Sequence, residues 1–140
     1  MSRSPQVLRV LLYAISAIEG IAGLILIFAS TWVVAFAPSA WVLSGLILYF
    51  IKGIGIISIA FGYLMCVAAR QPARYVAVID SFAFLAFGGA LLNLYALVIL
   101  GEAAYYPVSY LIARSIVLIV IGVALLVLRP RGAATANAPA

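Results

Sequence analysis

Four long apolar stretches dominate the pattern of hydrophobic and polar positions along this chain. They cover about residues 7–30, 42–69, 76–100 and 108–128. Each reaches or exceeds the ~20 residues that a helix needs to cross ~30 Å of hydrocarbon. The pattern therefore predicts an all-α integral membrane protein, built as a four-helix up-and-down bundle with short loops.

Composition supports a membrane as the solvent. Of the 140 residues, 69% are hydrophobic and 8% are charged, which leaves too little polar surface to cover a water-soluble globule. Residues 1–131 are expected to form a single four-span domain, and residues 132–140 lack an apolar periodicity and are expected to be disordered. The first stretch is too long for a signal peptide and contains Glu19, so it is interpreted as a retained helix.

The segments between the stretches alternate in charge, and this alternation predicts an orientation. Basic residues lie near both chain ends and in the second loop, whereas the other two loops carry one charged residue, Glu102. Short loops rich in Arg and Lys stay in the cytoplasm, so both termini and the loop at 70–74 are predicted to be cytoplasmic. The apolar segment 31–41, with Trp32 and Trp41, is expected to lie along the outer interface, or alternatively to bind a partner.

Each apolar stretch carries one charged residue in its interior: Glu19, Lys52, Asp80 and Arg114. Counting ~1.5 Å per residue from the cytoplasmic face places Glu19 at roughly 18 Å, Arg114 at roughly 21 Å, Lys52 at roughly 25 Å and Asp80 at roughly 8 Å. Because an unpaired charge is costly in hydrocarbon, we predict a salt bridge between Glu19 and Arg114. This pair is interpreted either as a device that fixes the register of the bundle or as a proton or substrate site.

The other two charges are nearer the membrane surfaces. Lys52 is expected to snorkel toward the outer face. Asp80 is expected to reach the cytoplasmic headgroups or to meet one of the arginines at that level, namely Arg9, Arg70, Arg74 or Arg129. Interfacial anchoring is therefore the simpler interpretation of both residues.

Small residues repeat on one side of the first and second stretches. Membrane helices associate by close packing through such residues and by hydrogen bonds between polar ones. The spacing predicts that the first two helices pack through Gly20, Gly23, Gly55, Ser58 and Gly62.

Residue types that carry most enzyme chemistry are scarce. The chain has no histidine and one cysteine, Cys66, so no base is available beside a nucleophile and no thiolate cluster can form. We therefore predict no catalytic, cofactor-binding or metal-binding residues and no enzymatic activity. The net charge of +5 is spread along the chain without a basic stripe, which argues against nucleic acid as a partner.

The layout resembles small bacterial inner-membrane proteins of the DoxX-like kind. The resemblance spans residues 7–131 and lies in four short-looped spans, an Ala-Ala-Arg-Gln-Pro-Ala-Arg turn after a Gly-rich second helix, and an Arg-Pro-Arg ending. It implies a multi-pass protein of the inner membrane with an accessory role near quinone-linked or thiol-related chemistry. No site residue is carried over from it.

Three functional hypotheses follow. The first is a structural or accessory protein that associates with membrane partners or with itself through its Gly-rich faces. The second is an oligomeric transporter or channel for a small ion or proton that uses Glu19, Arg114 and Lys52. The third is a lipid- or quinone-binding module, which requires an apolar cavity between the helices that opens toward the bilayer.

Overall fold

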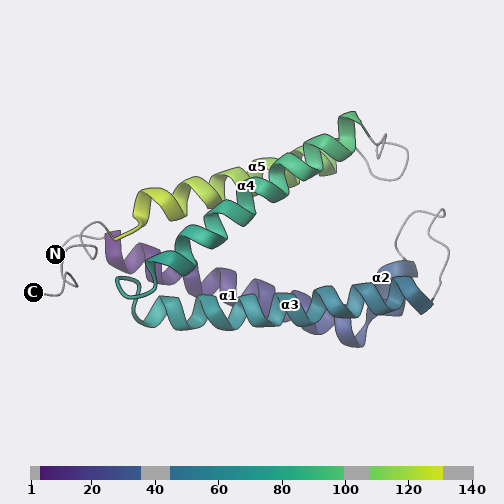
Figure 1. Cartoon of the computed structure of the whole chain (residues 1–140), viewed down its shortest axis with the longest axis horizontal. Coiled ribbons are helices and arrows are strands. Elements are labelled where there is room, and N and C mark those ends of the chain that lie inside the picture. The colour runs from purple at the N-terminus through teal and green to yellow at the C-terminus, as the bar shows by residue number, and fades with distance from the viewer. Residues whose placement is uncertain (1–3, 36–44, 100–107, 131–140) are drawn as a thin grey trace, which may run out of the picture.

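The fold was obtained as a computed structural model of the whole chain (Figure 1). The structure describes residues 4–35, 45–99 and 108–130. Within these ranges every regular element is a helix: α1 (Ser4–Phe28), α2 (Ser30–Ala35), α3 (Gly45–Arg70), α4 (Val76–Val98) and α5 (Val108–Leu128). The prediction of an all-α bundle is confirmed. The expected disorder of residues 132–140 lies outside the described residues.

Four of the described helices, all but α2, are long and apolar enough to cross a membrane, which supports a multi-pass membrane protein. Their bounds differ from the predicted ones by three residues at most. The helices run uninterrupted because proline stands only where a missing amide donor costs little. Pro5 lies in the first turn of α1, Pro72 in the turn after α3, and Pro130 just beyond α5.

Short connections fix the up-and-down path of the chain. The backbone amides of Arg74 and Tyr75 both donate to the carbonyl of Gln71, at 3.0 and 3.3 Å, and close a tight turn between α3 and α4. At the opposite end of the molecule, α2 begins two residues after the end of α1. The side chain of Trp32 in α2 is 71% exposed. This short helix is the described part of the segment predicted to lie at the outer interface, and residues 36–41 are outside the described ranges.

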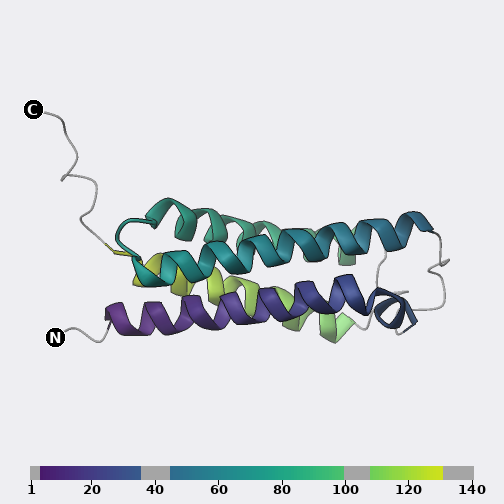
Figure 2. The ribbon, with the colours of Figure 1, turned by 90° about the horizontal axis from the view of Figure 1, so that it is seen from below.

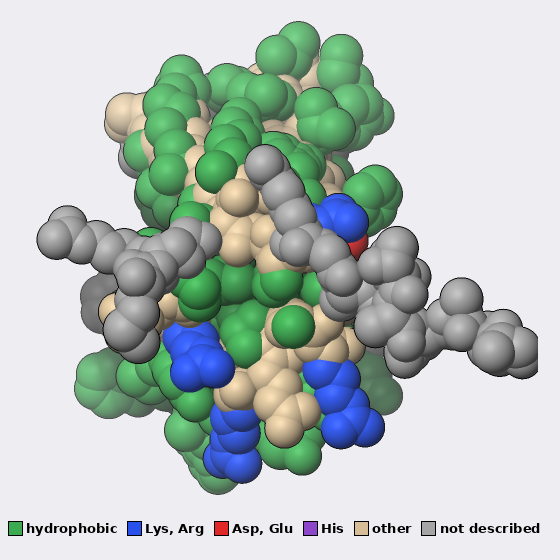
Figure 3. All heavy atoms as spheres, turned by 90° about the vertical axis from the view of Figure 1, so that its left-hand side faces the viewer, with side chains coloured by type: hydrophobic (Ala, Val, Ile, Leu, Met, Phe, Trp, Pro, Cys, Tyr) green, Lys and Arg blue, Asp and Glu red, His purple; other side chains and the backbone are tan. Residues whose placement is uncertain are grey.

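The four long helices form two antiparallel pairs that diverge from one end of the molecule (Figure 1). One pair is α1 with α3, which lie side by side along their length in Figure 2, and the other is α4 with α5. The end at which the pairs meet contains the start of α1, the 71–75 turn and the end of α5. We call it the basic end, because Figure 3 shows Lys and Arg side chains gathered on it. The opposite end is called the far end.

Glycine residues bring α1 and α3 into close contact. A Cβ atom added to Gly23 would lie 2.6 Å from the carbonyl oxygen of Gly55, and one added to Gly62 would lie 2.9 Å from the carbonyl oxygen of Ser16. Both distances are too short for real Cβ contacts, so the two backbones can approach this closely only without side chains at these positions. The α1/α3 pair is therefore held at distances that glycine alone permits.

The pair α4/α5 packs through a similar stripe of small residues. On α4 the buried residues recur at spacings of four and three, at Ile79, Ala83, Ala86 and Ala90. On α5, Gly122 lies under the ring of Phe87, which a Cβ atom would meet at 2.9 Å. The hydroxyl of buried Ser115 donates to the carbonyl of Leu111 at 2.9 Å. Spacings of this kind place one face of each helix against the other.

The hydrophobic core lies at the basic end. Its buried members come from all four long helices: Leu8, Leu12, Ile15, Met65, Ala68, Ala69, Ile79, Ala83 and Leu125. Because every one belongs to the part of its helix nearest the basic end, side chains from both pairs meet there. Toward the far end the pairs separate, and the space between them becomes the candidate site.

Candidate functional site

A cavity of about 320 Å³ lies between the two helix pairs, just beyond the core. We call it the central cavity. Each of the four long helices contributes to its lining, which consists of Ile15, Ile18, Glu19, Ile54, Ile57, Ser58, Phe61, Phe82, Leu85, Ala86, Leu118 and Ile121. Apart from Glu19 and Ser58, all these side chains are apolar. The cavity is thus a hydrophobic space with one carboxyl and one hydroxyl group on the side of the α1/α3 pair.

Helix packing explains why Glu19 faces this space. Glu19 is one turn beyond Ile15 on α1, so the two residues share a face. On the facing helix, Gly62 has no side chain, and a Cβ atom there would lie 3.5 Å from the Cβ atom of Glu19. The glycine leaves room for the carboxyl side chain to pass α3 and reach the cavity.

Glu19 has no ion pair and no hydrogen bond within the described part of the chain. The structure therefore does not confirm the predicted salt bridge with Arg114. Arg114 is exposed and does not line the central cavity, although it shares a stripe of α5 with Leu118 and Ile121, which do. At the depth predicted for Glu19, an ionised carboxylate without a partner costs at least about 2.5–3.5 kcal/mol on insertion scales.

Two physical reasons separate Glu19 from Arg114 despite their similar depth. First, the helix pairs diverge, and α1 and α5 belong to different pairs. Second, side chains on a helix lean toward its N-terminus, and α1 and α5 run in opposite directions. Glu19 therefore leans toward the basic end and Arg114 toward the far end. Depth counting placed the two Cα atoms at one level but did not include these directions.

Lys52 is also exposed and does not line the central cavity. It is about two turns from the start of α3 at the far end, which is within reach of the headgroup layer for a flexible lysine stem. Its placement is consistent with the interfacial anchoring predicted for it.

Asp80 pairs with Arg129, one of the four arginines expected to be within its reach. The Arg129 Nη1 atom lies 3.1 Å from the Asp80 Oδ2 atom and 3.2 Å from the Asp80 Oδ1 atom. The side chains of Arg129 and Asp80 are 44% and 36% exposed, and exposed pairs of this kind contribute about 0.2–1 kcal/mol in water. The pair joins α4 to the residue that follows α5 at the basic end, and neither of its members lines the central cavity.

The predicted packing residues divide into two groups. Gly23, Gly55 and Gly62 lie at the close contacts between α1 and α3. A Cβ atom on Gly20 would meet nothing within 4 Å, and Ser58 lines the central cavity rather than the helix contact. The spacing identified the correct pair of helices but assigned Ser58 to packing, because a small polar residue suits a helix contact and a cavity wall equally well.

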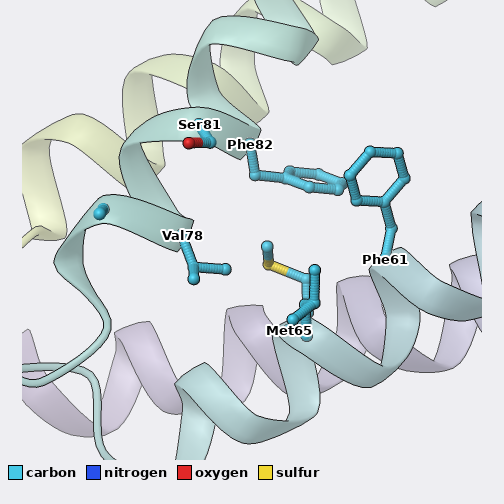
Figure 4. Close-up of a pocket in the computed structure, with 7 residues that line it drawn as sticks. Phe61, Met65, Val78, Ser81 and Phe82 are labelled. Atoms are coloured by element: carbon cyan, nitrogen blue, oxygen red, sulfur yellow. The ribbon is translucent and has the colours of Figure 1, made fainter.

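A second, smaller cavity of about 200 Å³ lies between α3 and α4, and we call it the lateral pocket (Figure 4). Its lining is Phe61, Leu64, Met65, Ala77, Val78, Ser81 and Phe82. Phe61 and Phe82 line both cavities, and their rings meet edge to face with centroids 6.0 Å apart. These two residues are the ones that the linings of the lateral pocket and the central cavity share.

The site has the composition of a binding site for an apolar molecule. Among the described residues there is no group of three His, Cys, Asp or Glu side chains that would hold a metal ion. The lining offers hydrophobic contact, aromatic ring faces, one hydroxyl and one carboxyl group. Sequence reasoning did not identify Phe61, Phe82 or Leu85 as site residues, because phenylalanine and leucine are equally common facing lipid.

Comparison with known proteins adds no relative: no family description, curated protein or solved structure matches this chain. The resemblance to DoxX-like proteins stays a prediction.

Proposed function

We propose that this protein binds a lipid-soluble molecule in the central cavity, between its two helix pairs. The observation that carries the proposal is a cavity of about 320 Å³ that is lined by all four long helices and contains a single unpaired carboxyl group. Binding sites for small molecules are typically concave and apolar, with a few placed polar groups that fix orientation. The central cavity has this character.

The surroundings of the cavity favour a molecule that arrives through the bilayer. The cavity lies between helices that are long and apolar enough to span a membrane. The lateral pocket adjoins it between α3 and α4, and the side chains of Phe61 and Phe82 line both spaces. We propose that rotation of either ring joins the two spaces and lets a molecule dissolved in the bilayer enter between these helices.

We also propose that the protein lies in the bacterial inner membrane with both termini in the cytoplasm. The positions of Arg70, Arg74 and Arg129 at the basic end support this orientation, because arginine-rich flanks stay on the cytoplasmic side. The short helix α2, with exposed Trp32, then lies at the outer interface.

A binding role does not require catalysis, and we propose no enzymatic activity. An accessory role beside another membrane protein, or in a homo-oligomer, is compatible with binding in the central cavity and stays a prediction. Transport of a small ion or proton also stays a prediction.

Mass spectrometry of the purified protein tests the proposal. Wild-type protein extracted in mild detergent should carry a lipid-soluble molecule at an amount that scales with the protein. Ser58→Phe should lose most of it, because the new ring occupies the central cavity.

Ala60→Phe is the matched control, since Ala60 is on the same helix but exposed. It should retain the bound molecule. Equal amounts in all three proteins, or none above the detergent background in wild type, would contradict the proposal.

A further inference from the structure

We infer that the molecule bound in the central cavity is an amphipathic cation, with a positive charge that meets Glu19 and an apolar body that fills the remaining space. The inference rests on the proposed binding function and specifies its ligand class. It follows from the charges around the cavity and the aromatic rings in its wall.

The charge distribution leaves Glu19 as the charged residue that lines the central cavity. The acidic residue Asp80 is engaged by Arg129 at the basic end. Lys52 is exposed and outside the lining, so it does not neutralise Glu19. A bound cation would supply the opposite charge that the described part of the protein does not place there. A bound anion would add a like charge to an apolar space, which is unfavourable.

The aromatic wall favours the same charge. Phe61 and Phe82 line the cavity from α3 and α4. The faces of aromatic rings carry negative electrostatic potential and attract cations, most strongly where water is excluded. Both rings belong to the cavity lining, so they are in contact with a molecule bound there. A cation that passes between the two spaces would therefore meet favourable contacts on both sides of this pair.

Arg114 is the group that opposes the inference. It lies on the same stripe of α5 as Leu118 and Ile121, one turn nearer the far end. Because it leans toward that end and does not line the cavity, Glu19 should determine the charge preference. If Arg114 determined it instead, the site would prefer anions.

Two ions of the same shape and opposite charge test the inference directly. Tetraphenylphosphonium and tetraphenylborate are titrated into the full-length protein in micelles of a neutral detergent, with protein-free micelles as the blank, and binding is followed by calorimetry. Wild type should bind the cation at least ten-fold more tightly than the anion. Glu19→Gln should lower the affinity for the cation at least ten-fold, and Glu19→Asp should retain the preference.

Asp80→Asn is the matched control, because it changes the net charge by the same amount outside the cavity. It should leave both affinities within two-fold of wild type, and helical circular dichroism verifies that each variant is folded. Equal binding of the two ions, tighter binding of the anion, or no cation binding would overturn the inference. The proposed binding function would survive such a result if wild type, but not Ser58→Phe, still carried a lipid-soluble molecule after purification.

Discussion

At the scale of single residues, glycine controls how closely α1 and α3 approach each other. An added Cβ atom would collide with the facing helix at Gly23 and Gly55, so glycine is needed there. At Gly53 it would meet nothing within 4 Å. In lipid, where apolar side chains gain little by leaving the solvent, this closeness supplies much of the attraction between helices. The effect is large because the nearest atom to an added Cβ at Gly23 or Gly55 is a backbone carbonyl oxygen of the facing helix, which cannot rotate away.

Gly23→Ala should destabilise the α1/α3 pair. The added methyl group would lie 2.6 Å from the carbonyl oxygen of Gly55, so the helices must separate. Overpacking of this kind typically costs about 1–3 kcal/mol in the free energy of unfolding. The midpoint of unfolding by sodium dodecyl sulfate in mixed micelles, followed by circular dichroism, measures the loss.

Gly53→Ala is the control for this change, because a Cβ atom there meets nothing within 4 Å. Its free energy of unfolding should stay the same or rise slightly, since alanine favours helix over glycine by up to about 1 kcal/mol. Similar losses in the two variants would show that the close contact is not what stabilises the pair.

The charged residues show how far sequence reasoning reaches at this scale. The sequence predicted that Asp80 could meet an arginine at its level, and the structure pairs it with Arg129. This prediction was possible because Asp80 lies near a helix end, where several arginines gather. It paired Glu19 with Arg114 from depth alone. Depth follows from counting residues, but the lean of a side chain and the divergence of the helix pairs do not, and these separate the two groups.

At the scale of elements, the apolar stretches predicted the helices well. Hydrocarbon leaves backbone polar groups no partners except one another, so a long apolar stretch has few alternatives to helix. The bounds of α5 agree with the predicted 108–128. The pairing of α1 with α3 and of α4 with α5 depends on which small residues face each other, and the length of an apolar stretch does not determine it. The central cavity was not predictable, since it depends on where the two pairs stop touching.

The orientation of these elements can be measured in intact cells. With Cys66 replaced by serine, Trp32→Cys in α2 should react with a membrane-impermeant maleimide added from outside. Gln71→Cys, in the turn between α3 and α4, should react only after the cells are opened. Both residues are exposed in the structure, so access to the reagent decides the outcome. Labelling of Gln71→Cys alone in intact cells would reverse the proposed orientation.

At the scale of the whole molecule, the arrangement resembles a wedge more than a parallel bundle (Figure 1). The core joins the two pairs at the basic end, and the same divergence that opens the central cavity also removes Arg114 from Glu19. A protein with parallel, fully packed helices would have neither the cavity nor the unpaired carboxyl group. The proposed binding function and the ligand class inferred from it therefore both depend on this divergence.

Distances between spin labels test the divergence most directly, with Cys66 again replaced. One doubly labelled variant carries labels at Val10 and Val127, near the basic end, and the other at Phe28 and Val108, near the far end, all at exposed positions on α1 and α5. Pulsed electron paramagnetic resonance in lipid bilayers should give a clearly longer distance for the far-end pair than for the basic-end pair. Equal distances at the two ends would mean that the helices run parallel, and would contradict the central cavity.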